Sequence, residues 1–295
     1  MRKIMRRRRL QDIDQRSVDT DGVMRRGPVE IVVQRRQPGR HIVARETAGF
    51  AEQNLDHGLV IRRIGLFRPG MDQRPVAVRK DSLYIGIDLG TTGVRAIAVD
   101  DDGKAHGEMS APIPTPPRTG DEITQDPTVW WKAFTGCLQN LLKQIDPQRV
   151  QAIAVDGTSG TLLLCDAKGG PVTPAIMYND RRALQQAKHI ASLAGDHSGA
   201  HGAGSALAKL MWLHDKKLDK RAQHALHQAD WISGKLTGQF GHSDYNNCLK
   251  LGFDAEKNDW PKWFSKLGFD SAMLPEVHAP GESLGTLSAD IAKTF

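Results

Sequence analysis

The sequence predicts an α/β fold in which a mixed β-sheet carries flanking helices. Three observations support this prediction. Residues 83–99 contain two apolar runs around a Gly-Thr-Thr-Gly segment, residues 126–145 place apolar side chains at helical spacing, and residues 150–157 form a further apolar run. Strands that alternate with a helix in this way are typical of a sheet covered by helices.

The first elements form an antiparallel meander. "LYIGID" and "VRAIAVD" each predict a buried strand, and the turn "DDG" at 101–103 leads to a third candidate strand, "KAHGEMSAPIP". Short connections of this kind join antiparallel neighbours.

A helix is predicted at residues 126–145. Asp126 is a good N-cap and Pro127 suits the first helical position. The apolar side chains that recur at helical spacing are Trp131, Phe134, Leu138, Leu141, Leu142 and Ile145. We expect this face to be core.

The remaining elements follow in the order strand, strand and then helices. "VQAIAVDGTSG" predicts a strand that ends in a loop of small residues, and "TLLLCDAKGGPVTPAIMY" predicts two strands joined at 168–170. "SALAKLMWLHD" and "ALHQADWISGKL" predict helices, so residues 195–236 are expected to form an insertion beside the sheet. His224 and His227 lie three residues apart in the last helix, and without a third ligand we interpret them as surface histidines rather than a metal pair.

The positive charge belongs to the first 80 residues. They carry 19 basic and 9 acidic residues, a net of +10, whereas residues 81–295 carry 21 basic and 25 acidic residues, a net of −4. Residues 1–80 show no sustained period of 2 or 3.6, so we predict an Arg-rich extension that is disordered or read from an upstream start, with Met71 as an alternative start. Its arginines keep nucleic-acid binding as an alternative, although no aromatic side chains interleave them.

Cysteine usage and hydropathy indicate a cytoplasmic protein. The three cysteines, Cys137, Cys165 and Cys248, are scattered, which gives no disulfide framework and no metal-ligand spacing. No run approaches the roughly 20 apolar residues of a membrane span. The sequence leaves open whether the chain forms a homodimer.

The loop between the first two strands predicts a site for a nucleotide triphosphate and its metal. Gly90, Thr91, Thr92 and Gly93 offer backbone N–H groups and two hydroxyls in a small space, which suits phosphate oxygens. Asp88 at the strand end can hold Mg²⁺, which prefers oxygen ligands. No Gly-Lys-Ser/Thr follows and no helix follows directly, so this is neither a Walker A loop nor a dinucleotide fingerprint.

This loop resembles the first phosphate loop of the superfamily that contains actin, Hsp70 and sugar kinases. The resemblance implies an actin-like, ribonuclease H-like ATPase fold and covers residues 82–295. Later stretches resemble one branch, the FGGY carbohydrate kinases, in that family's order: "VDGTSGTLLLCD", "PAIMYNDRRA", "QADWISGKLTG" and "SDYNNCLKLGFD". Thr158-Ser159 stands where xylulokinases tend to show a Met-His pair, so the likeness is closest to D-ribulose kinases.

The resemblance implies roles for individual residues. Asp244 in "SDYNN" matches the family's catalytic base, which would accept the proton of the attacking sugar hydroxyl. Asp88 matches the acid that helps to hold the metal and the sugar, and Thr91 belongs to the phosphate loop. Ser159 lies in a loop that touches the sugar in the family. An N-cap or turn role is the alternative for Asp244, and a local turn hydroxyl is the alternative for Ser159.

Two further polar residues are weaker candidates for sugar contacts. They are Asn179 and Asp180 in "PAIMYNDRRA". Asp156, after the strand "VQAIAV", is interpreted as a residue that only ends its strand.

The function implied is ATP-dependent phosphorylation of a ketopentose, D-ribulose or D-xylulose, with a small-molecule sugar as partner and neither membrane nor nucleic acid. Family members have a second lobe with another phosphate loop and the adenine pocket. The sequence ends at "SADIAKTF", so we expect the first lobe only, without useful turnover by itself. An Hsp70- or actin-like ATPase is the alternative. It shares "DLGTTG", but "SDYNN" and "DGTSG" favour the kinase.

Overall fold

A six-stranded mixed sheet is the centre of the fold. The computed structural model describes residues 29–33, 81–196 and 198–295. The sheet has the order β13-β1-β7-β2-β3-β4. Its strands are β1 (Glu30–Val33), β2 (Leu83–Leu89), β3 (Gly93–Val99), β4 (Ala105–Pro112), β7 (Val150–Gly157) and β13 (Ser283–Thr286).

The predicted meander and the mixed strand directions are confirmed. β2 pairs with β3, and β3 with β4, in antiparallel register. β7 lies on the other side of β2 and runs parallel to it. The carboxyl ends of β2 and β7 therefore meet at the same edge of the sheet, which is where ligands bind in open α/β sheets.

Two helices cover one face of this sheet. They are α1 (Thr128–Leu142) and α4 (Gln228–Thr237). The rings of Trp130 on α1 and Trp231 on α4 pack edge to face, with their centroids 6.2 Å apart. The predicted helix is confirmed, but the fully buried tryptophan is Trp130, whereas Trp131 is only half-buried. The N-cap residue is Pro127 rather than the predicted Asp126, because the helix begins one residue later, but the Asp126 carboxylate still accepts a hydrogen bond from the Thr128 N–H at 2.9 Å.

The Arg-rich segment contributes a strand to the sheet. β1 pairs parallel with β7 and antiparallel with β13, and Ile31 is fully buried in the core. The expectation that residues 1–80 stay outside the fold is therefore wrong for Glu30–Val33. The short run "EIVV" is apolar enough to form an inner strand but too short to show a period. Met71 and the remaining arginine clusters lie outside the described residues.

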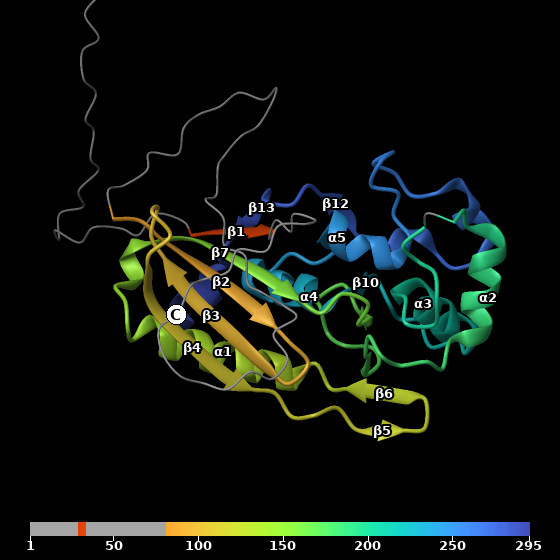
Figure 1. The fold of residues 1–295 in the computed structure, drawn as a ribbon, viewed down its shortest axis with the longest axis horizontal. Coiled ribbons are helices and arrows are strands. Elements are labelled where there is room, and N and C mark those ends of the chain that lie inside the picture. Colours follow the sequence, from red (N-terminus) through yellow and green to blue (C-terminus); the bar gives the residue numbers. More distant parts are fainter. Residues whose placement is uncertain (1–28, 34–80, 197) are drawn as a thin grey trace, which may run out of the picture.

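A second region with its own core lies beside the sheet, at the right in Figure 1. It contains the helices α2 (Leu184–Leu193) and α3 (Ala206–Asp215). Five short strands form two further small sheets: β5 (Arg118–Thr119), β6 (Glu122–Gln125) and β9 (Ala175–Ile176) in one, and β8 (Leu163–Cys165) and β10 (His224–Leu226) in the other. The sequence did not predict β5, β6 or α2. The predicted last helix is corrected as well, because its first residues form β10.

The last described part returns to the sheet. It contains β11 (His242–Asp244), α5 (Tyr245–Cys248), β12 (Glu276–His278) and α6 (Ala289–Thr294), with 3₁₀ turns at Leu249–Leu251, Lys262–Lys266 and Ser271–Met273. Another 3₁₀ turn, Pro147–Arg149, precedes β7. All three cysteines are free and buried. None of the helices in the described part of the chain combines the length and the apolar composition that a membrane crossing requires.

Candidate active site

The Gly-Thr-Thr-Gly segment forms the tight connection between β2 and β3. The Gly90 N–H donates to the Gly93 carbonyl at 2.9 Å, and the Ile113 N–H donates to the Thr92 carbonyl at 2.9 Å. A Cβ on Gly93 would lie 3.2 Å from the Ala111 carbonyl oxygen, so β4 leaves little room for a side chain there. Thr91 is half-buried and Thr92 is exposed. The loop therefore lies directly after the end of β2, with both threonines at least partly open to solvent.

Two aspartates lie side by side at the carboxyl ends of the parallel strands. Asp88 on β2 is the register partner of Asp156 on β7, and both are half-buried. One Asp156 oxygen accepts the Gly157 N–H at 2.8 Å. The sequence interpretation treated Asp156 as a strand end only. The signal it missed was that two parallel strands each end in Asp, which brings the two carboxylates to one edge.

The loop after β7 is hydrogen-bonded both to β2 and to the segment that follows β9. The Thr158 N–H donates to the Leu89 carbonyl at 3.3 Å, and the Thr161 hydroxyl accepts the Tyr178 N–H at 3.1 Å. Gly160 has a positive φ of 87°, and a Cβ there would lie 3.1 Å from the Gly204 carbonyl. Ser159 is half-buried between these anchors.

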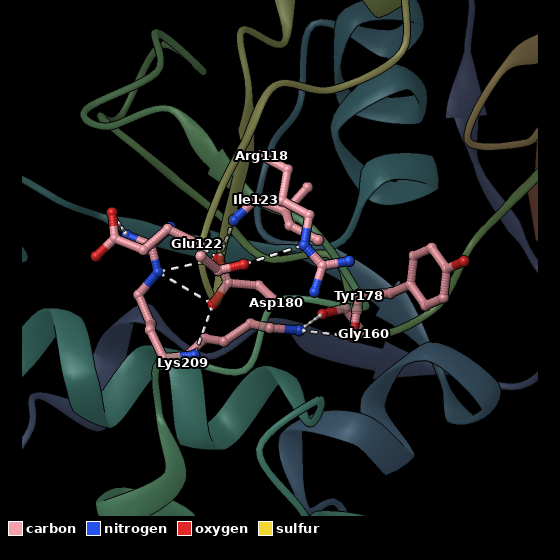
Figure 2. A network of polar contacts seen from close by, with 9 residues as sticks. Arg118, Glu122, Ile123, Gly160, Tyr178, Asp180 and Lys209 are labelled. Carbon is pink, nitrogen blue, oxygen red and sulfur yellow. Dashed lines mark hydrogen bonds and ion pairs between the residues drawn. The ribbon is translucent and has the colours of Figure 1, made fainter.

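The segment Tyr178–Asp180 holds two exposed side chains and one that is inaccessible. Tyr178 and Asn179 are exposed, whereas Asp180 is fully buried. The Asp180 carboxylate accepts the Ile123 N–H at 2.6 Å and the Arg182 guanidinium at 2.7–3.0 Å (Figure 2). These donors occupy both oxygens, which argues against the predicted sugar contact of Asp180. Asn179 remains a predicted contact.

Lys209 is a buried cation that the sequence analysis did not single out. Its ammonium donates to the carbonyls of Gly160 at 2.6 Å and Gly204 at 2.8 Å, and lies 3.4 Å from the Tyr178 carbonyl. Figure 2 shows this side chain reaching toward Gly160 and Tyr178. Burial lowers the pKa of Lys209 to about 7. One sequence feature could have indicated this burial: the predicted helix "ALAKLMWLHD" is apolar around its lysine, so it offers no polar face for the ammonium group.

Lys209 joins the two loops that carry the predicted sugar contacts. Gly160 directly follows Ser159, and Tyr178 directly precedes Asn179. Three carbonyl oxygens around one ammonium satisfy all its donors, which offsets the cost of burying a charge. Lys209 therefore holds together the two loops that carry these predicted contacts.

Asp244 is the N-cap of α5. One carboxylate oxygen accepts the N–H groups of Asn246 at 2.6 Å and Asn247 at 3.1 Å, and the other accepts the Asn247 side-chain amide at 3.1 Å. Burial, followed by the nearby Asp230 carboxylate, raises the pKa of Asp244 to about 6. The geometry thus shows the capping role that the sequence analysis gave as the alternative to a general base.

His224 and His227 do not form a pair on a helix. His224 lies in β10 and His227 is the N-cap of α4, where its N–H donates to the Asp230 carboxylate at 2.9 Å. His227 is almost fully buried, so its interpretation as a surface histidine is wrong.

A sequence model describing the FGGY family of carbohydrate kinases, N-terminal domain, matches residues 83–295. The chain belongs to this family. A xylulose kinase from Staphylococcus xylosus is 28% identical over 222 residues, covering 72% of this chain and 46% of the relative. A xylulose kinase from Escherichia coli (strain K12) is 25% identical over 220 residues, with the same shares of 72% and 46%.

Solved structures show the same fold. A xylulose kinase from Rhodospirillum rubrum has a TM-score of 0.65 at 23% identity, covering 72% of this chain and 46% of that chain. A gluconate kinase from Lactobacillus acidophilus has a TM-score of 0.66 at 20% identity, covering 72% and 45%. The chain thus spans about half the length of the proteins it matches. The predicted kinase family and fold are confirmed, and the family match decides against the chaperone or filament ATPase.

Proposed function

We propose that this chain provides the first lobe of an ATP-dependent kinase that phosphorylates a ketopentose, D-xylulose or D-ribulose. The observation that carries the proposal is the edge of the sheet where β2 and β7 end. There the Asp88–Asp156 pair adjoins the glycine-threonine loop and the Thr158–Thr161 loop. Phosphoryl transfer depends mainly on positioning and on neutralising charge, and loops with carboxylates at a strand edge supply both.

The nucleotide side of the site would consist of Asp88, Asp156 and the Gly90–Gly93 loop. Two neighbouring carboxylates fit Mg²⁺, which takes oxygen ligands and is often held by one or two carboxylates together with phosphate oxygens. When bound, the ion would offset the charge of the phosphate groups. The Thr91 and Thr92 hydroxyls would donate to phosphate oxygens.

The sugar side would consist of Ser159 and Asn179. The Thr161–Tyr178 hydrogen bond and the Lys209 ammonium hold their two loops together. A polyol presents donors and acceptors on every carbon, so a hydroxyl and an amide are suitable partners. The curated relatives described above are xylulose kinases, which favours D-xylulose, whereas Thr158-Ser159 is the feature that points to D-ribulose.

Asp244 has two candidate roles, as a general base and as the cap of α5. As a base it would accept the proton of the attacking hydroxyl, and a pKa of about 6 suits proton transfer near neutral pH. As a cap it needs one acceptor oxygen for the N–H groups of Asn246 and Asn247, which the amide oxygen of asparagine also provides. Asp244→Asn therefore separates the roles, since loss of the base lowers kcat by roughly 10²–10⁴.

Calorimetric titration of the chain with D-xylulose, D-ribulose, glycerol and D-gluconate tests the substrate class. We expect one ketopentose to bind at least about tenfold more tightly than glycerol or gluconate. Ser159→Ala should weaken that binding about fivefold, the effect of one lost hydrogen bond. Ser192→Ala, on the exposed side of α2, is the matched control and should change nothing.

Titration with ATP and Mg²⁺ tests the nucleotide side separately. Mg²⁺ should increase the affinity of the unaltered chain for ATP. Asp88→Asn should reduce this increase more than tenfold, because one carboxylate of the pair is lost. An ADP-release assay of the chain, alone and joined to the C-terminal half of a xylulose kinase, then measures turnover. Equal binding of all four polyols, or turnover independent of sugar, would reject the proposal.

A further inference from the structure

Three metal-ligating side chains converge on the parallel strands β11 and β12. His242 and Glu276 are register partners, and His278 lies two residues beyond Glu276 on the same face. The His242 Nδ1 atom lies 3.0 Å from His278 Nε2 and 3.6 Å from Glu276 Oε2. The His278 Nε2 atom lies 3.9 Å from Glu276 Oε1. All of these ligand atoms lie within 4.8 Å of one another.

We propose that His242, Glu276 and His278 bind a divalent transition-metal ion of the Zn²⁺ type. Two imidazoles and one carboxylate are suitable ligands for Zn²⁺ and Co²⁺, whereas Mg²⁺ prefers oxygen alone. Ligand atoms about 2.0–2.1 Å from a tetrahedral zinc ion lie about 3.3 Å apart. The observed separations of 3.0, 3.6 and 3.9 Å bracket this value, so small side-chain movements suffice.

A second carboxylate is placed to orient His278. Its other ring nitrogen, Nδ1, lies 3.5 Å from Glu282 Oε2. That oxygen is held by the Ala279 N–H, which donates to it at 3.0 Å. Carboxylates that accept the distal N–H of a metal-bound imidazole fix its tautomer and raise its basicity. Glu282 therefore favours the tautomer in which Nε2 is free to bind a metal.

The two histidines face each other through one ring nitrogen each. His242 Nδ1 and His278 Nε2 face each other at hydrogen-bond distance, so only one hydrogen can lie between them. Because Glu282 favours the His278 tautomer in which Nε2 carries no hydrogen, the shared hydrogen lies on His242 Nδ1. On binding, His242 takes its other neutral tautomer, with the hydrogen on Nε2, so that Nδ1 can bind the ion.

Solvent can reach the cluster. The Glu276 side chain is 70% exposed, and His242 is 26% exposed. A bound ion would fasten β11 to β12, and β11 ends at Asp244, the cap of α5. The ion would thereby stiffen the strand that leads into the candidate active site, with ligands different from those proposed for Mg²⁺.

Titration of the tag-free, metal-stripped chain with ZnCl₂ tests the proposal, by calorimetry and by thermal unfolding. We expect one Zn²⁺ per chain and a melting temperature that rises with zinc concentration, because only the folded state holds the three ligands together. CoCl₂ should give the visible absorption of nitrogen- and oxygen-bound Co²⁺. MgCl₂ should produce neither effect.

Matched variants identify the ligands. His242→Gln and His278→Gln should each weaken zinc binding more than tenfold, and Glu282→Gln should weaken it about tenfold, as an orienting residue does. Glu276→Gln should also weaken binding, and this side chain is too exposed for its loss to unfold the protein. His189→Gln, on the exposed side of α2, should leave binding unchanged. Zinc binding that survives in the His242→Gln/His278→Gln double variant, or no binding by the unaltered chain, would overturn the proposal.

Discussion

The edge of the sheet and the helical region beside it use their polar residues in different ways. At the sheet edge, Asp88, Asp156 and the Gly90–Gly93 loop follow directly from strand ends and remain partly exposed. In the helical region, Asp180 and Lys209 are fully buried and hold neighbouring segments together. Charged residues of the motifs thus differ in exposure: those at the sheet edge are partly open to solvent, and those in the helical region are buried among protein donors and acceptors.

The largest expected effect comes from breaking the buried ion pair of the helical region. Asp180→Ala leaves the Arg182 guanidinium and the Ile123 N–H without their acceptor, and removing one partner of a buried pair typically costs about 3–5 kcal/mol. Urea unfolding measures this loss. Asp121→Ala, an exposed acid nearby, is the control. If Asp180→Ala instead weakened sugar binding at unchanged stability, Asp180 would belong with the ligand-facing residues.

Breaking the sheet should cost almost as much. Ile31→Ala removes a fully buried side chain from β1, and such truncations cost about 3 kcal/mol. Leu184→Ala, at an exposed position, should change stability by less than about 0.5 kcal/mol. Chemical denaturation of both variants decides whether the Arg-rich segment stabilises the sheet. Equal stability of the two variants would mean that β1 contributes little to the stability of the sheet.

The sequence predicts a segment well when the residues that stabilise it are close in sequence, and poorly when they are distant in sequence. The meander, the helix at α1 and the strand β7 have clear local periods, and the Gly-Thr-Thr-Gly loop has a short motif. β1 was missed because four residues carry no period and their partners are β7 and β13, more than 100 residues away. β6 also has four residues and β5 only two.

The candidate site shows the same limit. Asp88 and the loop were identified from a contiguous motif, whereas the neighbour Asp156 required knowledge of strand pairing. The burial of Asp180 and of Lys209 depends on contacts with Ile123, Gly160 and Gly204 that no local pattern reveals. The metal-ligand cluster was missed for the same reason, since His242 and His278 meet only through the pairing of β11 with β12.

Lys209→Met tests whether the helical region positions the sugar loops. Methionine fills similar space but cannot donate, so buried carbonyls lose their partner and the free energy of unfolding should fall by about 2–3 kcal/mol. Ketopentose binding should weaken as well, because the Ser159 and Asn179 loops lose their common anchor. Lys188→Met, on the exposed side of α2, should alter neither quantity. Destabilisation with unchanged sugar affinity would limit Lys209 to a structural role.

The raised pKa of Asp244 makes stability depend on pH. The folded state keeps its proton up to a pH of about 6, whereas an unfolded aspartate releases it near 3.8. The free energy of unfolding should therefore fall by about 2 kcal/mol as the pH rises from about 4 to about 6. Asp244→Asn removes the titrating group, so its unfolding curves between pH 4 and 7 should lack this contribution. An unchanged pH profile would place the titration on another group.

The smallest effect separates the two roles of Asp244. At pH 7, Asp244→Ala should be about 1 kcal/mol less stable than Asp244→Asn, because alanine cannot accept the N–H groups of Asn246 and Asn247. If Asp244 only caps α5, the asparagine variant keeps near-normal activity once a C-terminal half is joined to the chain. If Asp244 is the base, both variants lose activity alike despite their difference in stability. Comparing activity with unfolding free energy across this pair therefore assigns Asp244 either a supporting role, like that of Asp180, or a role in the reaction.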